Sequence, residues 1–123
     1  MNISDQERAM IQQYLMSEET DIERSIGRIL LSDRGLETTS VIDAEALKEY
    51  HRYIKEKIQI FKHKICVEWN YQEKLKNVNF IDDIHLVAAI ADVIAKEVGI
   101  IPVFMVASLL VKKGLSKLCS SNL

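Results

Sequence analysis

The sequence predicts an all-α protein, and three observations support that class. Only four glycines and one proline occur in 123 residues, and none of them lies between Leu36 and Val98. A stretch of this length without either residue argues against a turn-rich β fold. Apolar residues also recur at helical spacing, and helix-capping patterns precede several of the apolar segments. We therefore expect a bundle of about five helices.

Composition limits the remaining possibilities. The chain has the length of one domain, which we place at residues 1–119, with a frayed tail at 120–123. An apolar content of 48% is that of a globular protein rather than a disordered or polytopic membrane protein. The first residues are polar and do not resemble a signal peptide. The two cysteines, Cys66 and Cys119, show no framework spacing, so we expect a cytoplasmic protein with reduced thiols.

Two capping patterns predict the first helices. Ser4–Glu7 has the spacing of a capping box and should begin a helix that ends near Ser17. Residues 20–23 repeat the pattern and should begin a second helix, which Gly35 would end. The segment 36–42 then reads as a polar connection.

The third predicted helix is the long central element of the fold. Asp43 should cap it, and no stop signal follows until about residue 76. It would have about 33 residues and be roughly 50 Å long, which exceeds what a compact domain of this size needs. Either the helix bends near residues 69–71, or one end protrudes and meets a second chain.

A C-terminal apolar hairpin follows, at about residues 83–113. Between Ile84 and Val111, 21 of 28 residues are Ala, Val, Ile, Leu, Met or Phe, and the run breaks at Gly99–Pro102. Asp82 or Asp83 should begin the first helix of this hairpin, which would end at Gly99. A second helix should run from about 102 to 113, and one more turn should cover 115–119.

Three environments suit such a hairpin: the protein core, a partner's surface or a lipid bilayer. Each half is too short to span a bilayer, which takes about 20 residues. We therefore favour a core position for the second helix. Ala91, Ala95 and Gly99 form a line of small residues at four-residue spacing, which predicts close packing of another backbone.

The long helix carries the candidate partner-binding residues. Its apolar positions alternate at steps of four and three, as in a helix–helix seam, and a basic stripe lies beside them. The predicted site comprises Lys48, Arg52, Lys55, Lys62, Ile54, Ile58, Phe61 and Ile65. Glutamates at 45, 49 and 56 flank the stripe, so we do not expect nucleic-acid binding. Residues 1–42 are acidic and 43–76 basic, which predicts attraction between these two segments.

Catalytic and metal-binding motifs are missing from the sequence. His63 and Cys66, like Asp82 and His85, share a helix face at spacing three, but the diagnostic spacings of helical metal sites do not occur. The four glycines are isolated, so no phosphate-binding loop exists. We expect no cofactor, no metal and no catalytic residue, and no small-molecule substrate is evident.

These observations favour a non-catalytic, helical interaction or regulatory module. An adaptor, an inhibitor or an immunity-type protein would fit, binding either a protein partner or another copy of itself. The alternative is a membrane-active effector whose apolar hairpin, residues 84–111, inserts into lipid when it is released. A nucleic-acid-binding or metal-dependent function ranks third.

Overall fold

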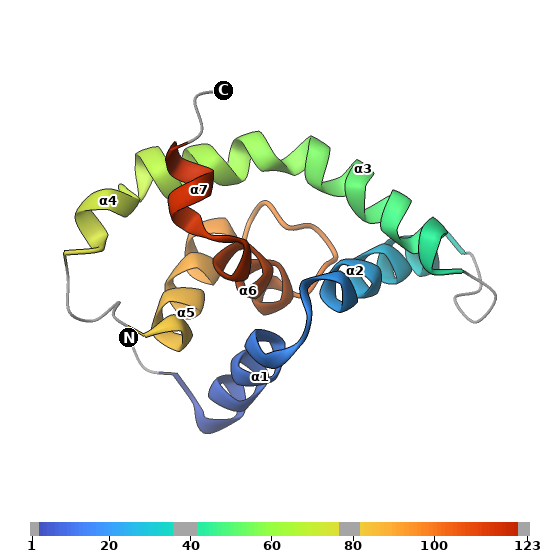
Figure 1. Ribbon diagram of the computed structural model, residues 1–123, viewed down its shortest axis with the longest axis horizontal. Coiled ribbons are helices and arrows are strands. Elements are labelled where there is room, and N and C mark those ends of the chain that lie inside the picture. Colours follow the sequence, from blue (N-terminus) through green and yellow to red (C-terminus); the bar gives the residue numbers. More distant parts are fainter. Residues whose placement is uncertain (1–2, 36–41, 77–81, 121–123) are drawn as a thin grey trace.

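Helices make up almost all of the described part of the chain, which comprises residues 3–35, 42–76 and 82–120 of a computed structural model (Figure 1). In chain order they are α1 (Asp5–Met16), α2 (Glu19–Asp33), α3 (Asp43–Lys62), the π-helix η2 (His63–Glu68), α4 (Tyr71–Lys74), α5 (Asp83–Ile94), α6 (Val103–Lys113) and α7 (Leu115–Ser120). No strand occurs among these residues, and the predicted all-α class is confirmed. Ser120 still belongs to α7, and the rest of the predicted tail lies outside the described residues.

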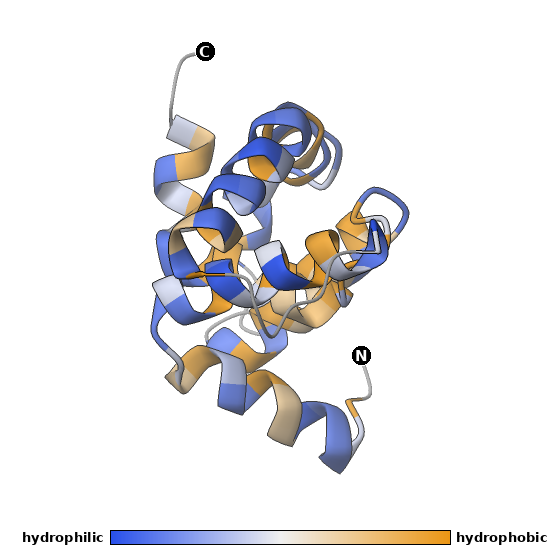
Figure 2. Cartoon of the chain, turned by 90° about the vertical axis from the view of Figure 1, so that its right-hand side faces the viewer, coloured by the Kyte–Doolittle hydropathy of each residue, from blue (hydrophilic) through white to orange (hydrophobic). Residues whose placement is uncertain are grey.

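Helix α6 lies at the centre of the core. Six consecutive residues, Met105–Leu110, are buried, and the helix contacts α1, α2, α5 and α7. Figure 1 shows α3 along one side of the molecule and α1 on the opposite side, with α5 and α6 between them. In Figure 2 many of the hydrophobic segments lie toward the middle of the molecule, and much of the surrounding ribbon is hydrophilic. The predicted core position of this helix is confirmed.

The long helix runs from Asp43 through Lys62 as α3 and continues to Glu68 as η2. It ends there, and not near residue 76 as predicted, because Asn70 adopts a positive φ of 58°. A right-handed helix cannot contain that conformation. The chain turns at this point and forms the short helix α4. The predicted bend near residues 69–71 is therefore confirmed, while the predicted end of the helix is wrong.

Local capping chemistry fixes two of the helix starts. The Ser4 hydroxyl accepts the Glu7 N–H at 3.0 Å, and the Glu7 carboxylate accepts the Ser4 N–H at 3.1 Å, as predicted. The Asp82 carboxylate accepts the His85 N–H at 2.8 Å and caps α5. This backbone hydrogen bond is the main reason that the pKa of Asp82 lies below its ordinary value.

Two other predicted caps are wrong. Helix α2 begins one residue before Thr20, with Glu18 as its N-cap and no side-chain cap hydrogen bond. Asp43 is the first helical residue of α3 and not its cap. Its carboxylate instead pairs with Arg28 of α2, and this hydrogen bond lowers the pKa of Asp43. A contact between two helices has thus replaced a local capping bond.

The connection between α5 and α6 is tied to the long helix. Helix α5 ends at Ile94, earlier than the predicted Gly99, and the buried Val98 lies in the turns that follow. The Tyr53 hydroxyl of α3 donates a hydrogen bond of 2.7 Å to the Val98 carbonyl. Burial raises the pKa of Tyr53 to about 12. Ala95 and Gly99 are exposed, so the predicted line of small residues is not a packing surface.

The close backbone approach occurs instead where α2 crosses α3. Gly27 of α2 is buried against Ala46 of α3, and a Cβ at position 27 would lie 1.8 Å from the Ala46 carbonyl oxygen. Arg34, the C-cap residue of α2, also pairs with the nearly buried carboxylate of Glu49 on α3, at 2.9 Å. The crossing therefore combines a steric requirement for glycine with ion pairs on either side of it.

Among the helices of the described residues, none is both long enough and apolar enough to cross a membrane.

We expect Gly27→Ala to lower the free energy of unfolding by about 1–3 kcal/mol, because the new methyl group would overlap the α3 backbone. Helix propensity alone predicts the opposite, a gain of about 1 kcal/mol. Chemical denaturation followed by circular dichroism measures the difference. Ser32→Ala, at an exposed position of the same helix, is the matched control. A gain in stability at position 27 would show that the helices do not meet there.

Candidate functional site

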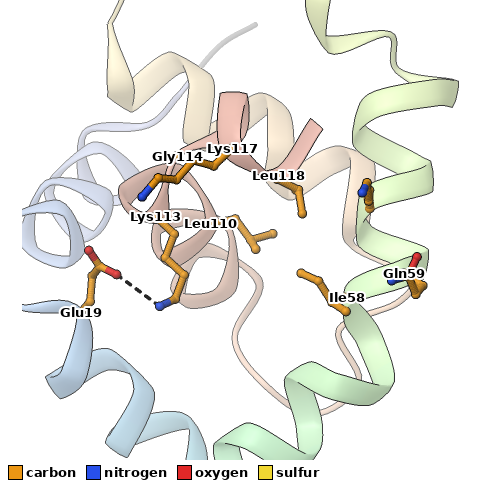
Figure 3. Close-up of a pocket in the computed structure, with 9 residues that line it drawn as sticks. Glu19, Ile58, Gln59, Leu110, Lys113, Gly114, Lys117 and Leu118 are labelled. Carbon is orange, nitrogen blue, oxygen red and sulfur yellow. Dashed lines mark hydrogen bonds and ion pairs between the residues drawn. The ribbon is translucent and has the colours of Figure 1, made fainter. Parts of the chain in front are cut away.

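A pocket of about 440 Å³ lies where α2, α3, α6 and α7 come together (Figure 3). Each of these helices contributes residues to its wall. The lining comprises Glu19 of α2, Ile58, Gln59 and Lys62 of α3, Leu110 and Lys113 of α6, Gly114, and Lys117 and Leu118 of α7. Its volume falls within the range of sites that bind small molecules or side chains, about 300–1,000 Å³.

The floor of the pocket is apolar. The side chains of Ile58, Leu110 and Leu118 converge on it from α3, α6 and α7 (Figure 3). Leu110 is buried, whereas Ile58 and Leu118 are half-buried and keep part of their surface open to the pocket. Covering such surface with an apolar group of a ligand is favourable by about 25 cal/mol per Å².

Lys113 lies at one side of the pocket within a network of acidic groups. Its ammonium is 3.2 Å from the carboxylate of Glu19 and 2.7 Å from that of Glu23. Glu23 is buried and is also hydrogen-bonded to the hydroxyl of the buried Tyr50. Burial, followed by the nearby Glu23 carboxylate, raises the pKa of Tyr50 and keeps this hydroxyl a donor.

Two opposing effects act on Lys113 itself. Burial disfavours its charge, but the hydrogen bonds and the attraction from Glu23 and Glu19 outweigh burial and raise the pKa of Lys113. The stability that comes from this raised pKa is complete below the ordinary lysine value of 10.5. It is lost as the pH rises through the higher value in the folded protein. Lys113 is therefore a fixed, neutralised part of the wall.

Lys117 has a different environment. It is exposed on α7, and within the described residues no carboxylate lies within ion-pair distance of its ammonium. Lys62 reaches the pocket from α3 and is half-buried. The lining as a whole carries three lysines and one glutamate. The pocket thus combines an apolar floor with an excess of positive charge.

The expectation of reduced thiols is wrong. Cys66 of η2 and Cys119 of α7 form a disulfide, with their Cα atoms 5.4 Å apart. The two residues are 53 positions apart, and the fold brings them together because α7 packs beside η2. The Tyr71 hydroxyl and the Ser116 hydroxyl, 3.2 Å apart, form a second link between α7 and the segment after η2. Both links hold α7 in place as a wall of the pocket.

The structure divides the predicted partner-binding residues into three groups. Ile58 and Lys62 line the pocket. Phe61 and Ile65 are fully buried in the core of the chain, so they offer no surface to a partner. Ile54 is half-buried on α3, and the exposed Lys48, Arg52 and Lys55 lie on that helix outside the pocket.

Sequence reasoning missed Leu110, Lys113, Lys117 and Leu118, which face Ile58 across the pocket. No motif relates them to α3, because they meet that helix only through the packing of α6 and α7. The alternation of apolar residues with lysines at 110–118 was the available signal.

Within the described residues, no group of three or more His, Cys, Asp or Glu side chains is arranged to hold a metal ion. Cys66, which shares a helix face with His63 in the sequence, is bonded to Cys119. The His85 ring lies 2.8 Å from its predicted neighbour Asp82, in the first turn of α5.

No known protein family, no characterised protein and no solved structure matches the chain.

Replacing Lys113 with Met should lower the free energy of unfolding by about 1–3 kcal/mol, because the buried Glu23 carboxylate would lose its cation. Thermal and chemical denaturation measure the loss. Adding Glu23→Gln should restore part of it, since a neutral amide needs no cation. Lys96→Met, at an exposed lysine, is the control and should change little. An equal loss in both lysine variants would contradict the network.

Reduction of the disulfide should lower the free energy of unfolding by up to about 4 kcal/mol, the value of the chain-entropy model for a loop of this length. Denaturation with and without dithiothreitol measures the difference. The double variant with Cys66→Ser and Cys119→Ser should have the free energy of unfolding of the reduced protein, and dithiothreitol should not change it. Free thiols in protein purified without reductant would contradict the pairing.

Proposed function

We propose that this chain is a non-catalytic protein-interaction module, and that its pocket binds an acidic segment of a protein partner. The observation that supports this proposal is the combination of side chains in one pocket. Ile58, Leu110 and Leu118 supply an apolar floor, and the lysines around them outnumber the single glutamate. The segment bound there would place an apolar side chain on the floor and a carboxylate near Lys117.

The chemistry of the pocket favours this ligand over a nucleic acid. Among the residues that the structure describes, none of those lining the pocket is aromatic, so they offer no stacking platform for a base. Glu19 and Glu23 neutralise Lys113, which reduces the positive charge that a phosphate backbone would require. A single carboxylate beside an apolar group needs less charge and uses the apolar floor.

The partner's contact surface can extend from the pocket along α3. Ile54 lies one helical turn before Ile58, and Lys55 lies two turns before Lys62, on the same faces of the helix. Ile54 is half-buried and Lys55 is exposed. A longer segment of the partner would therefore contact Ile54 and Lys55 beyond the pocket, just as it contacts Ile58 and Lys62 within it. The pocket and its extension along α3 together include four of the partner-binding residues predicted from the sequence, Ile54, Lys55, Ile58 and Lys62.

The alternative as a membrane-active effector has less support. Its apolar hairpin would need to release α6, whose six consecutive buried residues are covered by neighbouring helices of the same chain. Binding to a second copy of the chain remains an outcome of the test below, because the N-terminal segment is itself acidic.

The cytoplasmic location stays a prediction. One of its two arguments, the expected reduced thiols, no longer holds. The disulfide found in the structure replaces the reduced thiols from which that location was inferred. In the cytoplasm of most organisms a disulfide is usually transient and redox-sensing, whereas in an oxidising compartment it is permanent. The thiol state of the protein in freshly lysed cells, trapped by alkylation, distinguishes these cases.

A selection from displayed random peptides on the oxidised protein tests the proposed function. We expect the selected peptides to pair an acidic residue with a branched apolar one, and to bind in fluorescence anisotropy. Lys117→Glu should weaken that binding by about tenfold, because it reverses the charge at the pocket. Leu118→Ser should weaken it as well, because it removes part of the floor.

Lys48→Glu is the matched control, since this lysine is exposed on α3 outside the pocket. Its effect should be much smaller than that of Lys117→Glu. Equal losses would indicate non-specific attraction, and a loss from Lys48→Glu alone would move the site to the basic stripe. Light scattering at rising protein concentration reports self-association, and a dimer broken by Lys117→Glu would make the partner a second copy.

A further inference from the structure

We propose that the Cys66–Cys119 disulfide is a redox latch on the pocket. When oxidised it holds α7 in place as a wall of the pocket, and its reduction releases α7 and lowers the affinity for the acidic segment. This regulation rests on the proposed function. The movement of α7 that it requires can be measured without any ligand.

Helix α7 depends on links to the rest of the chain. It has six residues, far fewer than the 12–15 at which an isolated helix becomes even marginally stable in water. Leu115 is its only buried residue. Gly114, with a positive φ of 105°, separates it from α6 and provides a hinge. Leu118 and Cys119 are partly buried and also pack against the core, and the Tyr71–Ser116 hydrogen bond and the disulfide are further links.

The disulfide joins the two sides of the pocket. On one side, Lys117 and Leu118 line the pocket and immediately precede Cys119. On the other side, Lys62 is the last residue of α3, which continues directly into η2 and Cys66. Figure 3 shows Leu118 of α7 facing Ile58 of α3 across the pocket. Breaking the bond therefore removes a covalent cross-link between these walls.

The latch requires that a reductant reach the bond. Both cysteines are half-buried at the edge of the core. A thiolate of a dithiol attacks one sulfur, which breaks the S–S bond, forms a mixed disulfide and releases the other cysteine as a thiolate that takes up a proton. The second thiol of the reductant then closes a ring on its own sulfur. The reductant leaves oxidised, and both cysteines remain as thiols.

The consequences for the site follow from which residues move. Release of α7 would carry away Lys117, which forms no ion pair within the described residues, and Leu118, one of the three apolar side chains of the floor. Ile58, Leu110 and Lys113 would stay, because α3 and α6 are held by the core. The reduced protein would keep its fold and lose much of its binding site.

Hydrogen exchange measured by mass spectrometry tests the movement directly. Reduction with dithiothreitol should speed the exchange of the α7 amides at least tenfold and leave the α6 amides slow. Unchanged exchange in α7 would overturn the latch. Fast exchange in α6 as well would also overturn it, because the disulfide would then support the whole fold and not α7 alone.

Fluorescence anisotropy with a peptide selected on the oxidised protein tests the effect on binding. Reduction should raise its Kd about tenfold, the loss expected from removing Lys117 and Leu118. Equal affinity of the oxidised and reduced forms would overturn the regulation. If no peptide binds the oxidised protein, the proposed function fails, while hydrogen exchange still decides whether the latch exists.

Two further samples separate the disulfide from side effects of the reductant. Reduced protein whose cysteines are joined again through a single methylene group should keep α7 protected and bind the peptide, even in dithiothreitol. Tyr71→Phe, which removes the hydrogen bond to Ser116 but keeps the disulfide, should bind when oxidised and still respond to reduction. Binding lost equally in Tyr71→Phe without reduction would assign the control of α7 to that hydrogen bond.

Discussion

Burial of α6 on all sides is the constraint on which the rest of the structure depends. A helix with six consecutive apolar or small residues in its middle has no face that water can cover favourably, so other helices must surround it. Helices α1, α2 and α5 do so directly. Helix α2 in turn brings α3 close, because Gly27 lets the backbone at Ala46 come into contact. The fold is thus organised outward from one element.

The same constraint explains why a pocket exists. The long helix formed by α3 and η2 has 26 residues, whereas α6 has 11, so the long helix extends past the end of the core helix. The short helix α7 occupies part of the remaining space and leaves the pocket beside it. Because α7 buries little of its own surface, it depends on Leu115 and on the bond to Cys66. One wall of the binding site is therefore formed by α7, a helix that depends on its links to the rest of the chain.

The features that the sequence predicted correctly are those with local causes. The Ser4–Glu7 capping box, the positive φ at Gly35 and the core position of α6 each follow from residues within a few positions of one another. The features that it did not predict depend on distant partners. Gly27 meets a carbonyl 19 positions away, and Cys66 meets Cys119 53 positions away. Of the residues that line the pocket, the sequence identified Ile58 and Lys62 of α3, because periodicity marks one helix and not the elements that face it.

Charge illustrates the same limit in another way. The acidic character of residues 1–42 and the basic character of 43–76 predicted an attraction between acids of the first segment and bases of the second. The ion pairs between α2 and α3 run the other way, from Arg28 to Asp43 and from Arg34 to Glu49. The acids Glu19 and Glu23 pair with Lys113 of α6 instead. The net charge of a segment does not determine which of its charged side chains form ion pairs in the folded protein. Because these acids are already taken by Lys113, they do not neutralise Lys117, and the positive charge of the pocket remains for a partner.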